Sequence, residues 1–453
     1  MDISASEALP VEATSAPFEP AGSVAGDRLP QQIVVVAAMY VGYAMFMVLR
    51  MIPTVAGAAI RQDPALGINL EVWGQILAVG TWGAVVGKII CGYAADRFGG
   101  KLTFTVGLFL ASIFVGVFGF VSDYRLFAAA FFLALMAKSA GWPSMARIIV
   151  NWFKPDQYGR VWGILSTSSR VGTLAATFGL GSLMAYMSWR GMLWIAAVMG
   201  ILAAAVFAIL LRERPEKAPP PADEAADRSK LAAPHPFDGM TVFEVIPCLL
   251  RSRQFWLIAG SLMGLGILWD FLLMVPLFLQ DTLHLSAVDA SRAASAFPFG
   301  SLISVLIGGY VFDKLSRGGT AWVMGLLLTV ATECLVAFLV LPRFDLSANS
   351  LLWSSLGLLF LFGLCVSPCY YIPMSVFSIE FGGPHSGFLI ALLDALSFSA
   401  TAVFYYFGGG FAERSWNLFL AVLVAISVWS AATTFAFLRG EARRLTMPHA
   451  SGG

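Results

Sequence analysis

Eight ionisable side chains stand inside long apolar stretches of this sequence, where a charge is costly. Placing a charged side chain at the centre of a bilayer costs about 3 kcal/mol or more, so such residues are functional candidates by default. Arginine offers a planar fork that fits a phosphate or a carboxylate, and a carboxylate can take up a proton or pair with a cation. The basic residues are Arg50, Lys88, Lys138, Arg147 and Arg170, and the acidic ones are Asp270, Glu333 and Asp394.

The elements that carry these charges must be membrane helices. Of the 453 residues, 58% are hydrophobic and 12% are charged, whereas an ordinary soluble protein has about a quarter charged residues. A net charge of +1 argues against a nucleic-acid-binding protein, which would carry a basic stripe. The five cysteines are scattered without metal-ligand spacing. We therefore expect a polytopic membrane protein with no metal or cofactor.

Twelve apolar stretches are long enough to cross a bilayer as helices, which takes about 20 residues each. We expect them near 32–55, 70–94, 102–121, 125–150, 158–186, 191–211, 254–280, 287–311, 321–342, 350–376, 385–410 and 416–438. They predict an all-α membrane fold of twelve transmembrane helices in two six-helix bundles. The predicted divisions are a disordered tail (1–31), a first bundle (32–211), a polar linker (212–253), a second bundle (254–438) and a C-terminal tail (439–453).

The distribution of basic residues predicts the orientation of the chain. Of the 28 lysines and arginines, most of those outside the spans fall in segments that share one side of the membrane with both termini. Because cytoplasmic loops carry an excess of positive charge, we expect both termini in the cytoplasm and the protein in the inner (plasma) membrane.

One short pattern occurs at the same place in both halves, after the second span of each. It reads Gly92-x-x-x-Asp96-Arg97 in the first half and Gly309-x-x-x-Asp313 in the second. We interpret the glycine as a site of close helix approach, and Asp96, Arg97 and Asp313 as gating residues that latch a neighbouring helix in one conformation. Two registered copies predict a duplicated transporter of the major facilitator type, working by alternating access around one midplane site.

The first half resembles a known transporter family. The pieces Gly141-Trp142-Pro143, residues 151–155 (Asn-Trp-Phe-Lys-Pro) and residues 163–168 (Gly-Ile-Leu-Ser-Thr-Ser) are similar to the organophosphate:phosphate antiporters, which carry glycerol 3-phosphate, hexose phosphates and glucose 6-phosphate. The resemblance is best from about residue 40 to 215 and looser beyond. It implies a carrier of a small organic anion.

The resemblance also assigns candidate substrate-binding residues. Arg50 falls on the first-span arginine that grips phosphate, and Tyr43 precedes it on the same helix face. Lys138 stands where the family has a glutamine, Trp142 belongs to the Gly-Trp-Pro motif, and Arg170 follows the position of a binding-site histidine. Lys138 and Arg170 could instead pair with the acidic residues as scaffolding. Lys88 matches a second-span lysine, for which we favour a pathway or gating role. We expect Arg147 to snorkel to the interface or to contact the Asp96 motif.

The second half departs from the family. The antiporters have a second arginine in the seventh span, which corresponds here to a position near Leu268, and no basic residue stands there. Asp270 and Asp394 are coupling or gating candidates with three open roles: binding a proton, receiving polar groups of the substrate, or pairing with the arginines. We hypothesise that one of them senses protons. Glu333 is expected to be peripheral.

The sequence thus predicts a secondary transporter of an organophosphate-like, carboxylate or sulfonate anion, by proton symport or anion exchange. The alternative is a membrane sensor of a phosphorylated metabolite, related to the transporters. We expect no enzyme activity, because the four histidines lie apart from any nucleophile or metal set. The expected partners are the organic anion, the lipid bilayer and protons, with no nucleic acid, and we expect a monomer.

Overall fold

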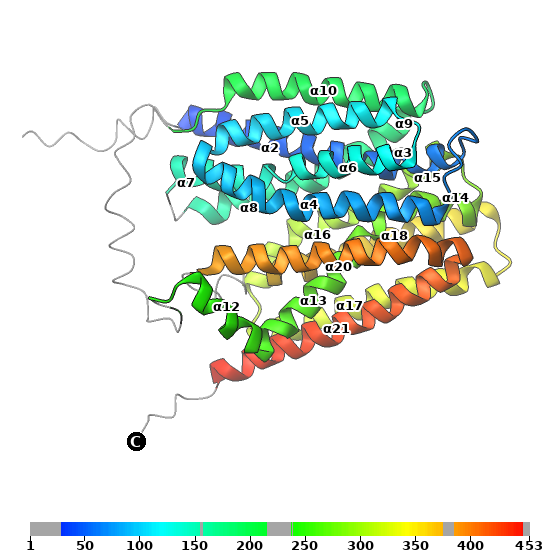
Figure 1. Cartoon of the computed structure of the whole chain (residues 1–453). Helices are drawn as coiled ribbons and strands as arrows, with labels where there is room; N and C mark the ends of the chain where they lie inside the picture. The colour runs from blue at the N-terminus through cyan, green and yellow to red at the C-terminus, as the bar shows by residue number, and fades with distance from the viewer. Residues whose placement is uncertain (1–28, 155–156, 215–236, 238, 375–384, 447–453) are drawn as a thin grey trace, which may run out of the picture.

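The structure is a computed structural model that describes residues 29–154, 157–214, 237, 239–374 and 385–446. Over these residues it is all-helical, and the long helices run side by side along one direction (Figure 1). Residues 1–28 of the predicted tail and most of the predicted linker, 215–236, lie outside the described residues.

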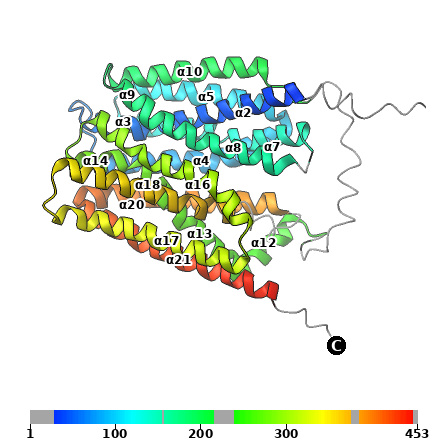
Figure 2. The ribbon, with the colours of Figure 1, turned by 180° about the vertical axis from the view of Figure 1, so that it is seen from behind.

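The first half, α2 to α10, forms one side of the bundle, and the second half, α12 to α21, forms the other (Figures 1 and 2). The first half comprises α2 (Leu29–Arg50), α3 (Ile52–Arg61), α4 (Leu70–Phe98), α5 (Gly100–Phe120), α6 (Tyr124–Lys138), α7 (Gly141–Trp152), α8 (Tyr158–Leu174), the π-helix η2 (Ala175–Leu180), α9 (Gly181–Leu183) and α10 (Trp189–Leu210). The second comprises α12 (Val242–Arg251), α13 (Arg253–Asp270), η3 (Phe271–Leu273), α14 (Val275–Leu283), α15 (Ala287–Ala294), α16 (Ala296–Asp313), α17 (Arg317–Val340), η4 (Leu341–Arg343), α18 (Ala348–Ile372), α20 (Ser386–Arg414) and α21 (Trp416–Thr446).

Eleven helical stretches in the described part of the chain are long and apolar enough to cross a membrane. The remaining expected span, 158–186, which is the fifth along the chain, forms the continuous helix α8–η2–α9 but is not among the eleven. Its serines, threonines and two arginines lower its hydropathy. It packs between α2 and α16, one from each half, so its polar side chains are shielded by protein.

Two ends of the bundle can be distinguished. We call the end where α2 begins and α21 ends the termini end, and the opposite end the distal end; α3, α14 and α15 lie at the distal end (Figure 1).

Two helices extend into segments that were expected to lie outside the spans. Helix α21 continues to Thr446, past the predicted end at 438, because the charged residues that follow are good helix formers and extend beyond the apolar layer. Helix α12 forms inside the predicted linker, where Thr241 and Glu244 make a capping box and Val245 and Leu249 are buried.

Asn151 and Trp152, from the family-like piece Asn-Trp-Phe-Lys-Pro, have a structural role at the termini end. The Trp152 indole N–H donates to the Arg212 carbonyl (2.8 Å), and Asn151 donates to the Glu213 carbonyl (3.2 Å). The Glu213 carboxylate in turn accepts from the backbone N–H groups of Gly100 and Lys101 (3.0 and 2.7 Å), at the start of α5. The motif therefore ties the ends of three helices together, and acts away from the charged site.

Close helix packing occurs at glycines other than those of the repeated motif. A Cβ added at Gly92 or Gly309 would meet nothing within 4 Å, so our interpretation of these two glycines was wrong. A Cβ at Gly74 would lie 2.5 Å from the Tyr405 carbonyl oxygen and 2.8 Å from the Gly409 Cα. The close approach is therefore between α4 and α20, near the distal end, and it joins the two halves.

Gly74→Ala is expected to lower the free energy of unfolding by about 1–3 kcal/mol, because backbone atoms of α20 cannot yield to the new methyl group. Gly92→Ala on the same helix is the matched control and should be neutral or slightly stabilising, since alanine is the better helix former. Thermal unfolding of the purified proteins in detergent measures both. Equal Tm values for the two variants would contradict the packing argument.

Candidate functional site

Three of the candidate ionisable residues stand at breaks in membrane helices. Arg50 is the last residue of α2, Lys138 the last of α6 and Asp270 the last of α13. Each span resumes a few residues later, with Pro53 and Pro276 in the first turns of α3 and α14. The last carbonyls of a helix carry a partial negative charge, which favours the two cations there and disfavours the aspartate unless it is paired.

The Arg50 guanidinium pairs with the Asp270 carboxylate across the two halves. The Nη2–Oδ1 distance is 2.5 Å, and both side chains are more than nine-tenths buried. The Tyr405 hydroxyl of α20 donates to the Asp270 carbonyl oxygen at 2.5 Å, which adds a contact at the end of α13. Of the roles left open for Asp270, the structure shows pairing with the arginine.

A second ion pair joins the halves between Lys88 of α4 and Asp394 of α20. The Phe398 ring lies between the two pairs: the Lys88 Nζ is 4.3 Å and the Arg50 Cζ 5.6 Å from its centroid. The Tyr370 hydroxyl lies 3.5 Å from the other Asp394 oxygen. The two pairs and the phenylalanine therefore form one continuous group.

Lys138 is near all four of these paired charges but has no carboxylate within ion-pair distance in the described part of the chain. Its charge interacts with Arg50, Lys88, Asp270 and Asp394, and its Nζ lies 5.8 Å from the centroid of the Tyr43 ring. The expected scaffolding pair of Lys138 with an aspartate is therefore not formed.

The aromatic wall beside Lys138 includes both predicted aromatic residues. The Tyr43 and Trp142 ring centroids are 5.6 Å apart, and Trp142 lies against Trp162 at 4.4 Å. Trp142 is 43% exposed, so the protein covers its ring only in part.

Arg170 is the other cation without a carboxylate partner among the described residues. It is buried, and its Nη1 donates to the Ser166 carbonyl (3.1 Å) and the Ser169 hydroxyl (2.8 Å), both on its own helix. Its Nε–H is buried without a hydrogen-bond partner within the described residues. The guanidinium lies over the Trp269 ring of the second half, 5.2 Å from the centroid. It also interacts electrostatically with Tyr43.

We call these six ionisable residues the central charge cluster: Arg50, Lys88, Lys138, Arg170, Asp270 and Asp394. The four cations outnumber the two acids, so the cluster has a formal excess of two positive charges, located on Lys138 and Arg170. An unpaired charge away from water is unfavourable. The arrangement is therefore suited to bind an anion.

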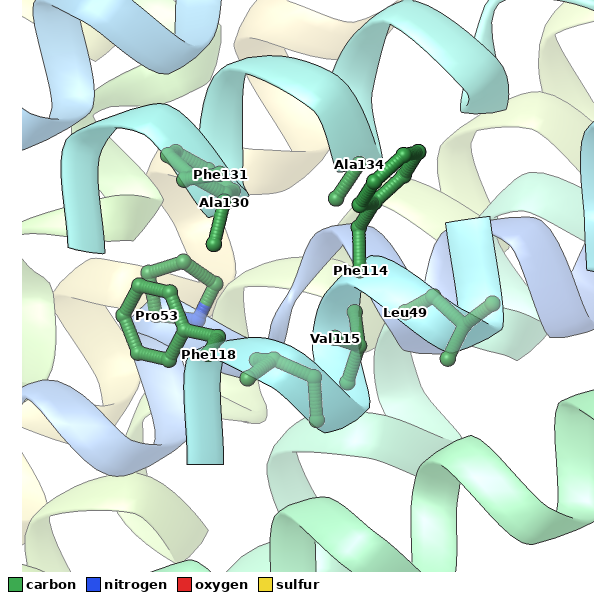
Figure 3. Close-up of a pocket in the computed structure, with 9 residues that line it drawn as sticks. Leu49, Pro53, Phe114, Val115, Phe118, Ala130, Phe131 and Ala134 are labelled. Atoms are coloured by element: carbon green, nitrogen blue, oxygen red, sulfur yellow. The ribbon is translucent and has the colours of Figure 1, made fainter. Parts of the chain in front are cut away.

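The apolar gap in Figure 3 is a different feature. It lies inside the first half between α2–α3, α5 and α6 and is lined by Leu49, Ile52, Pro53, Phe114, Val115, Phe118, Ala130, Phe131 and Ala134. No charged side chain lines it, so we regard it as imperfect packing beside the α2–α3 break rather than an anion site.

The structure does not bring the other candidates into the cluster. Asp96 and Arg97 are exposed at the termini end, and Asp96 has no ion pair in the described part of the chain. The Asp313 side chain lies outside the described residues. Arg147 is half-buried, with its Cβ facing Gly100. Glu333 is exposed on α17, away from the cluster, so its predicted peripheral position is confirmed.

Sequence reasoning missed several residues near the cluster. Phe398 and Tyr405 contact its charges from α20, and Trp162 extends the aromatic wall. Only Trp162 carried a local signal, because it immediately precedes the Gly-Ile-Leu-Ser piece. Arg61 and Asp281 form an ion pair at the distal end that sequence analysis did not anticipate, because both residues fall outside the expected apolar spans 32–55 and 254–280.

Comparison with known proteins identifies the family. Residues 34–404 match the Major Facilitator Superfamily. The chain belongs to this superfamily. A probable hexose phosphate transport protein of Chlamydia pneumoniae is 25% identical over 62% of this chain and 64% of its own length. A probable L-galactonate transporter of Escherichia coli is 27% identical over 67% of each chain. The membrane sensor protein UhpC of Escherichia coli is 24% identical over 67% of this chain and 71% of its own.

Solved structures show the same major facilitator fold. A bacterial homologue of the human lysosomal transporter Spinster, in an inward-facing and unoccupied conformation, matches with a TM-score of 0.70 at 15% identity and covers 90% of this chain and 97% of that one. The predicted all-α fold and the resemblance to proteins of the hexose phosphate transport group are therefore confirmed, and the chain is a multi-pass membrane protein of the Major Facilitator Superfamily.

The buried Arg50–Asp270 pair can be tested by a double-mutant cycle. Arg50→Met or Asp270→Leu alone leaves an unpaired buried charge, and each is expected to cost about 3–5 kcal/mol of stability. The double variant should be more stable than either single one, because it removes both charges at similar volume. Thermal unfolding in detergent measures all three. Strictly additive losses would show that the two side chains do not interact.

Proposed function

We propose that this major facilitator protein transports a small organic anion with two negative charges, bound by Lys138 and Arg170 beside the Arg50–Asp270 pair. The observation that carries this proposal is the excess of two positive charges in the central charge cluster. Every acid in the cluster is already paired, so a ligand is the available source of compensating charge. Phosphate monoesters carry about −1.5 to −2 at neutral pH, and diacids carry a similar charge.

The surroundings of the two cations favour an organic ligand over inorganic phosphate. Tyr43, Trp142 and Trp269 present ring faces beside Lys138 and Arg170, and such faces pack against the carbon skeleton of a sugar or polyol. Asp394 and Tyr370 offer polar atoms for hydroxyl groups. The relatives named for hexose phosphate and L-galactonate transport both support an organic anion with a hydroxylated carbon skeleton, and of the two the hexose phosphate also matches the double charge.

The charge excess also favours exchange over proton symport. A carrier that returns empty must enclose its site without ligand, which here would enclose two uncompensated positive charges. A carrier that moves only when loaded avoids that cost. Asp270 and Asp394 are each paired with a cation, so neither needs a proton to be neutralised. We therefore favour anion exchange in the plasma membrane, with the termini end cytoplasmic and the chain acting as a monomer.

Ligand binding should depend on the charge of the anion. A hexose 6-phosphate is expected to raise the Tm of the purified protein more than the matching hexose 6-sulfate, which has the same size but one negative charge. Lys138→Gln or Arg170→Gln should weaken binding of the phosphate by about 10- to 100-fold, the value of one charged hydrogen bond. Arg125→Gln, an exposed distal arginine, is the control. Equal stabilisation by the phosphate and the sulfate would contradict the proposal.

Flux measurements separate the mechanisms. Proteoliposomes loaded with the ligand identified by Tm are expected to take up labelled ligand at least about tenfold faster than unloaded ones, because the unloaded carrier must enclose the charge excess. A protonophore should have no effect. Uptake by unloaded proteoliposomes that a protonophore abolishes would show proton symport instead. Binding without flux under either condition would favour the sensor, the function named for the UhpC relative.

A further inference from the structure

A groove on the outer surface of the bundle is separate from the central charge cluster. On the face that Figure 1 shows, α4 runs between α6 and α20, and these three helices line the groove. The lining comes from the stretches 75–79 of α4 and 124–133 of α6 and from Tyr406 of α20, and the volume is about 530 Å³. All three helices belong to candidate membrane spans, so the groove faces lipid.

We infer that this feature, which we call the lateral groove, binds one zwitterionic phospholipid from the leaflet at the distal end. The lipid phosphate lies on Arg125, the ammonium of its head group faces Glu71, and one acyl chain occupies the apolar part of the groove. The inference concerns a lipid site outside the substrate path, and it holds whichever anion the central charge cluster binds.

The apolar part of the groove has the length of an acyl chain within one leaflet. From Arg125 to Leu133 the lining follows eight residues of α6, which span about 12 Å at 1.5 Å per residue. One leaflet contributes about half of the 30 Å hydrocarbon core. Ala128 and Ala129 lie along this stretch, and their small side chains leave the space that the chain occupies.

The distal end of the groove supplies a cation for the lipid phosphate. Arg125 is exposed, and its Nε donates to the Tyr124 hydroxyl at 3.1 Å. The neighbouring Asp123 carboxylate interacts with this charge and accepts from the Arg125 backbone N–H at 2.7 Å, as the N-cap of α6. The Nη groups of Arg125 make no hydrogen bond within the described residues. They are therefore available to a phosphate, the group that a guanidinium fork fits.

An acid on the opposite side of the groove favours a zwitterionic head group over an anionic one. Glu71 lies one turn before Gln75 on the same face of α4, and it is exposed beside α20, where a Cβ at Gly410 would lie 3.9 Å from the Glu71 Cγ. Glu71 has no ion pair in the part of the chain that the structure describes. A primary ammonium neutralises this carboxylate and donates hydrogen bonds to it, whereas a quaternary ammonium has no N–H to donate.

Two polar side chains inside the groove also point to a polar ligand. Neither the Gln75 amide nor the Tyr406 hydroxyl makes a hydrogen bond within the described residues, although both lie on helices that cross the membrane. A polar group without a partner is costly in hydrocarbon. The ester carbonyls of a phospholipid are acceptors next to its phosphate, so they satisfy these two donors.

A lipid in the lateral groove contacts both halves of the protein. Tyr406 belongs to the second half and follows Tyr405, whose carbonyl oxygen approaches Gly74, the residue before Gln75. The groove therefore lies beside the close contact between α4 and α20. Because the lipid binds only where these helices are packed, it should stabilise the folded protein.

The head-group end is tested with the full-length protein, freed of lipid in detergent. Phosphatidylethanolamine, phosphatidylglycerol and phosphatidylcholine with identical acyl chains are added separately. Tm and native mass spectrometry then report stabilisation and the number of lipids retained. Phosphatidylethanolamine is expected to stabilise most, with one molecule retained. Arg125→Gln should weaken its binding about three- to tenfold, the effect of one interfacial cation. Glu71→Gln should remove the preference over phosphatidylglycerol, and the exposed Arg343→Gln is the control.

The acyl-chain end is tested by filling the groove. Ala129→Phe should weaken phosphatidylethanolamine binding at least about tenfold, because several methylene groups lose their contact with the protein. Ala205→Phe, at an exposed position of α10, is the matched control and should have no effect. Equal stabilisation by all three lipids, or binding that neither Arg125→Gln nor Ala129→Phe weakens, would show non-specific lipid contact only and overturn the inference.

The lipid measurements contain no sugar phosphate, so their outcome is independent of the proposed function. Arg125 is not part of the central charge cluster. Arg125→Gln should therefore lose lipid binding while it keeps the stabilisation by a hexose 6-phosphate, and Lys138→Gln should show the reverse. Loss of both ligands in Arg125→Gln would contradict two separate sites.

Discussion

The cost of burying an unpaired charge is the constraint on which this structure depends. Two of the four central cations meet an aspartate from the opposite half, and these pairs join the halves. The other two cations, Lys138 and Arg170, meet only hydroxyls, carbonyls and aromatic faces. Cation–π contacts and neutral hydrogen bonds compensate a charge only in part. The fold therefore leaves an excess of positive charge around Lys138 and Arg170, and these two residues form the candidate binding site.

The helix breaks explain why these charges can be accommodated at all. The C-terminal end of a helix segment favours a cation. Arg50 and Lys138 are the last residues of α2 and α6. Asp270 occupies the corresponding position with the wrong sign, and Arg50 together with the Tyr405 hydroxyl compensates for it. Irregular backbone at membrane depth is thus used where it faces protein and charge rather than lipid.

The sequence predicted which residues belong to the site better than it predicted which of them contact each other. Depth within an apolar span is a local property, so Arg50, Lys138 and Asp270 could be identified from the chain alone. Which cation meets which acid depends on the helices that become neighbours, and that is a property of the fold. The alignment places the seventh-span arginine position near Leu268, where no basic residue stands, but it could not reveal that Arg50 meets Asp270, two residues further along the chain. The prediction of close helix packing at the glycines of the repeated motif failed for the same reason, because close packing depends on which helices become neighbours. Gly74, outside the motif, lies against α20 instead.

The two halves are related by duplication, but they contribute different residues to the site. In the antiporters that this chain resembles, each half supplies an arginine to the anion. Here no basic residue stands near Leu268, and Arg50 instead pairs with Asp270 of the second half, so this pair neutralises itself and holds the halves together. The positive charge for a ligand then has to come from other positions, and both Lys138 and Arg170 belong to the first half. The second half contributes Trp269 as a ring face to Arg170. An anion bound there is held mainly by one half, and it can change the contact between the halves only by competing for Arg50.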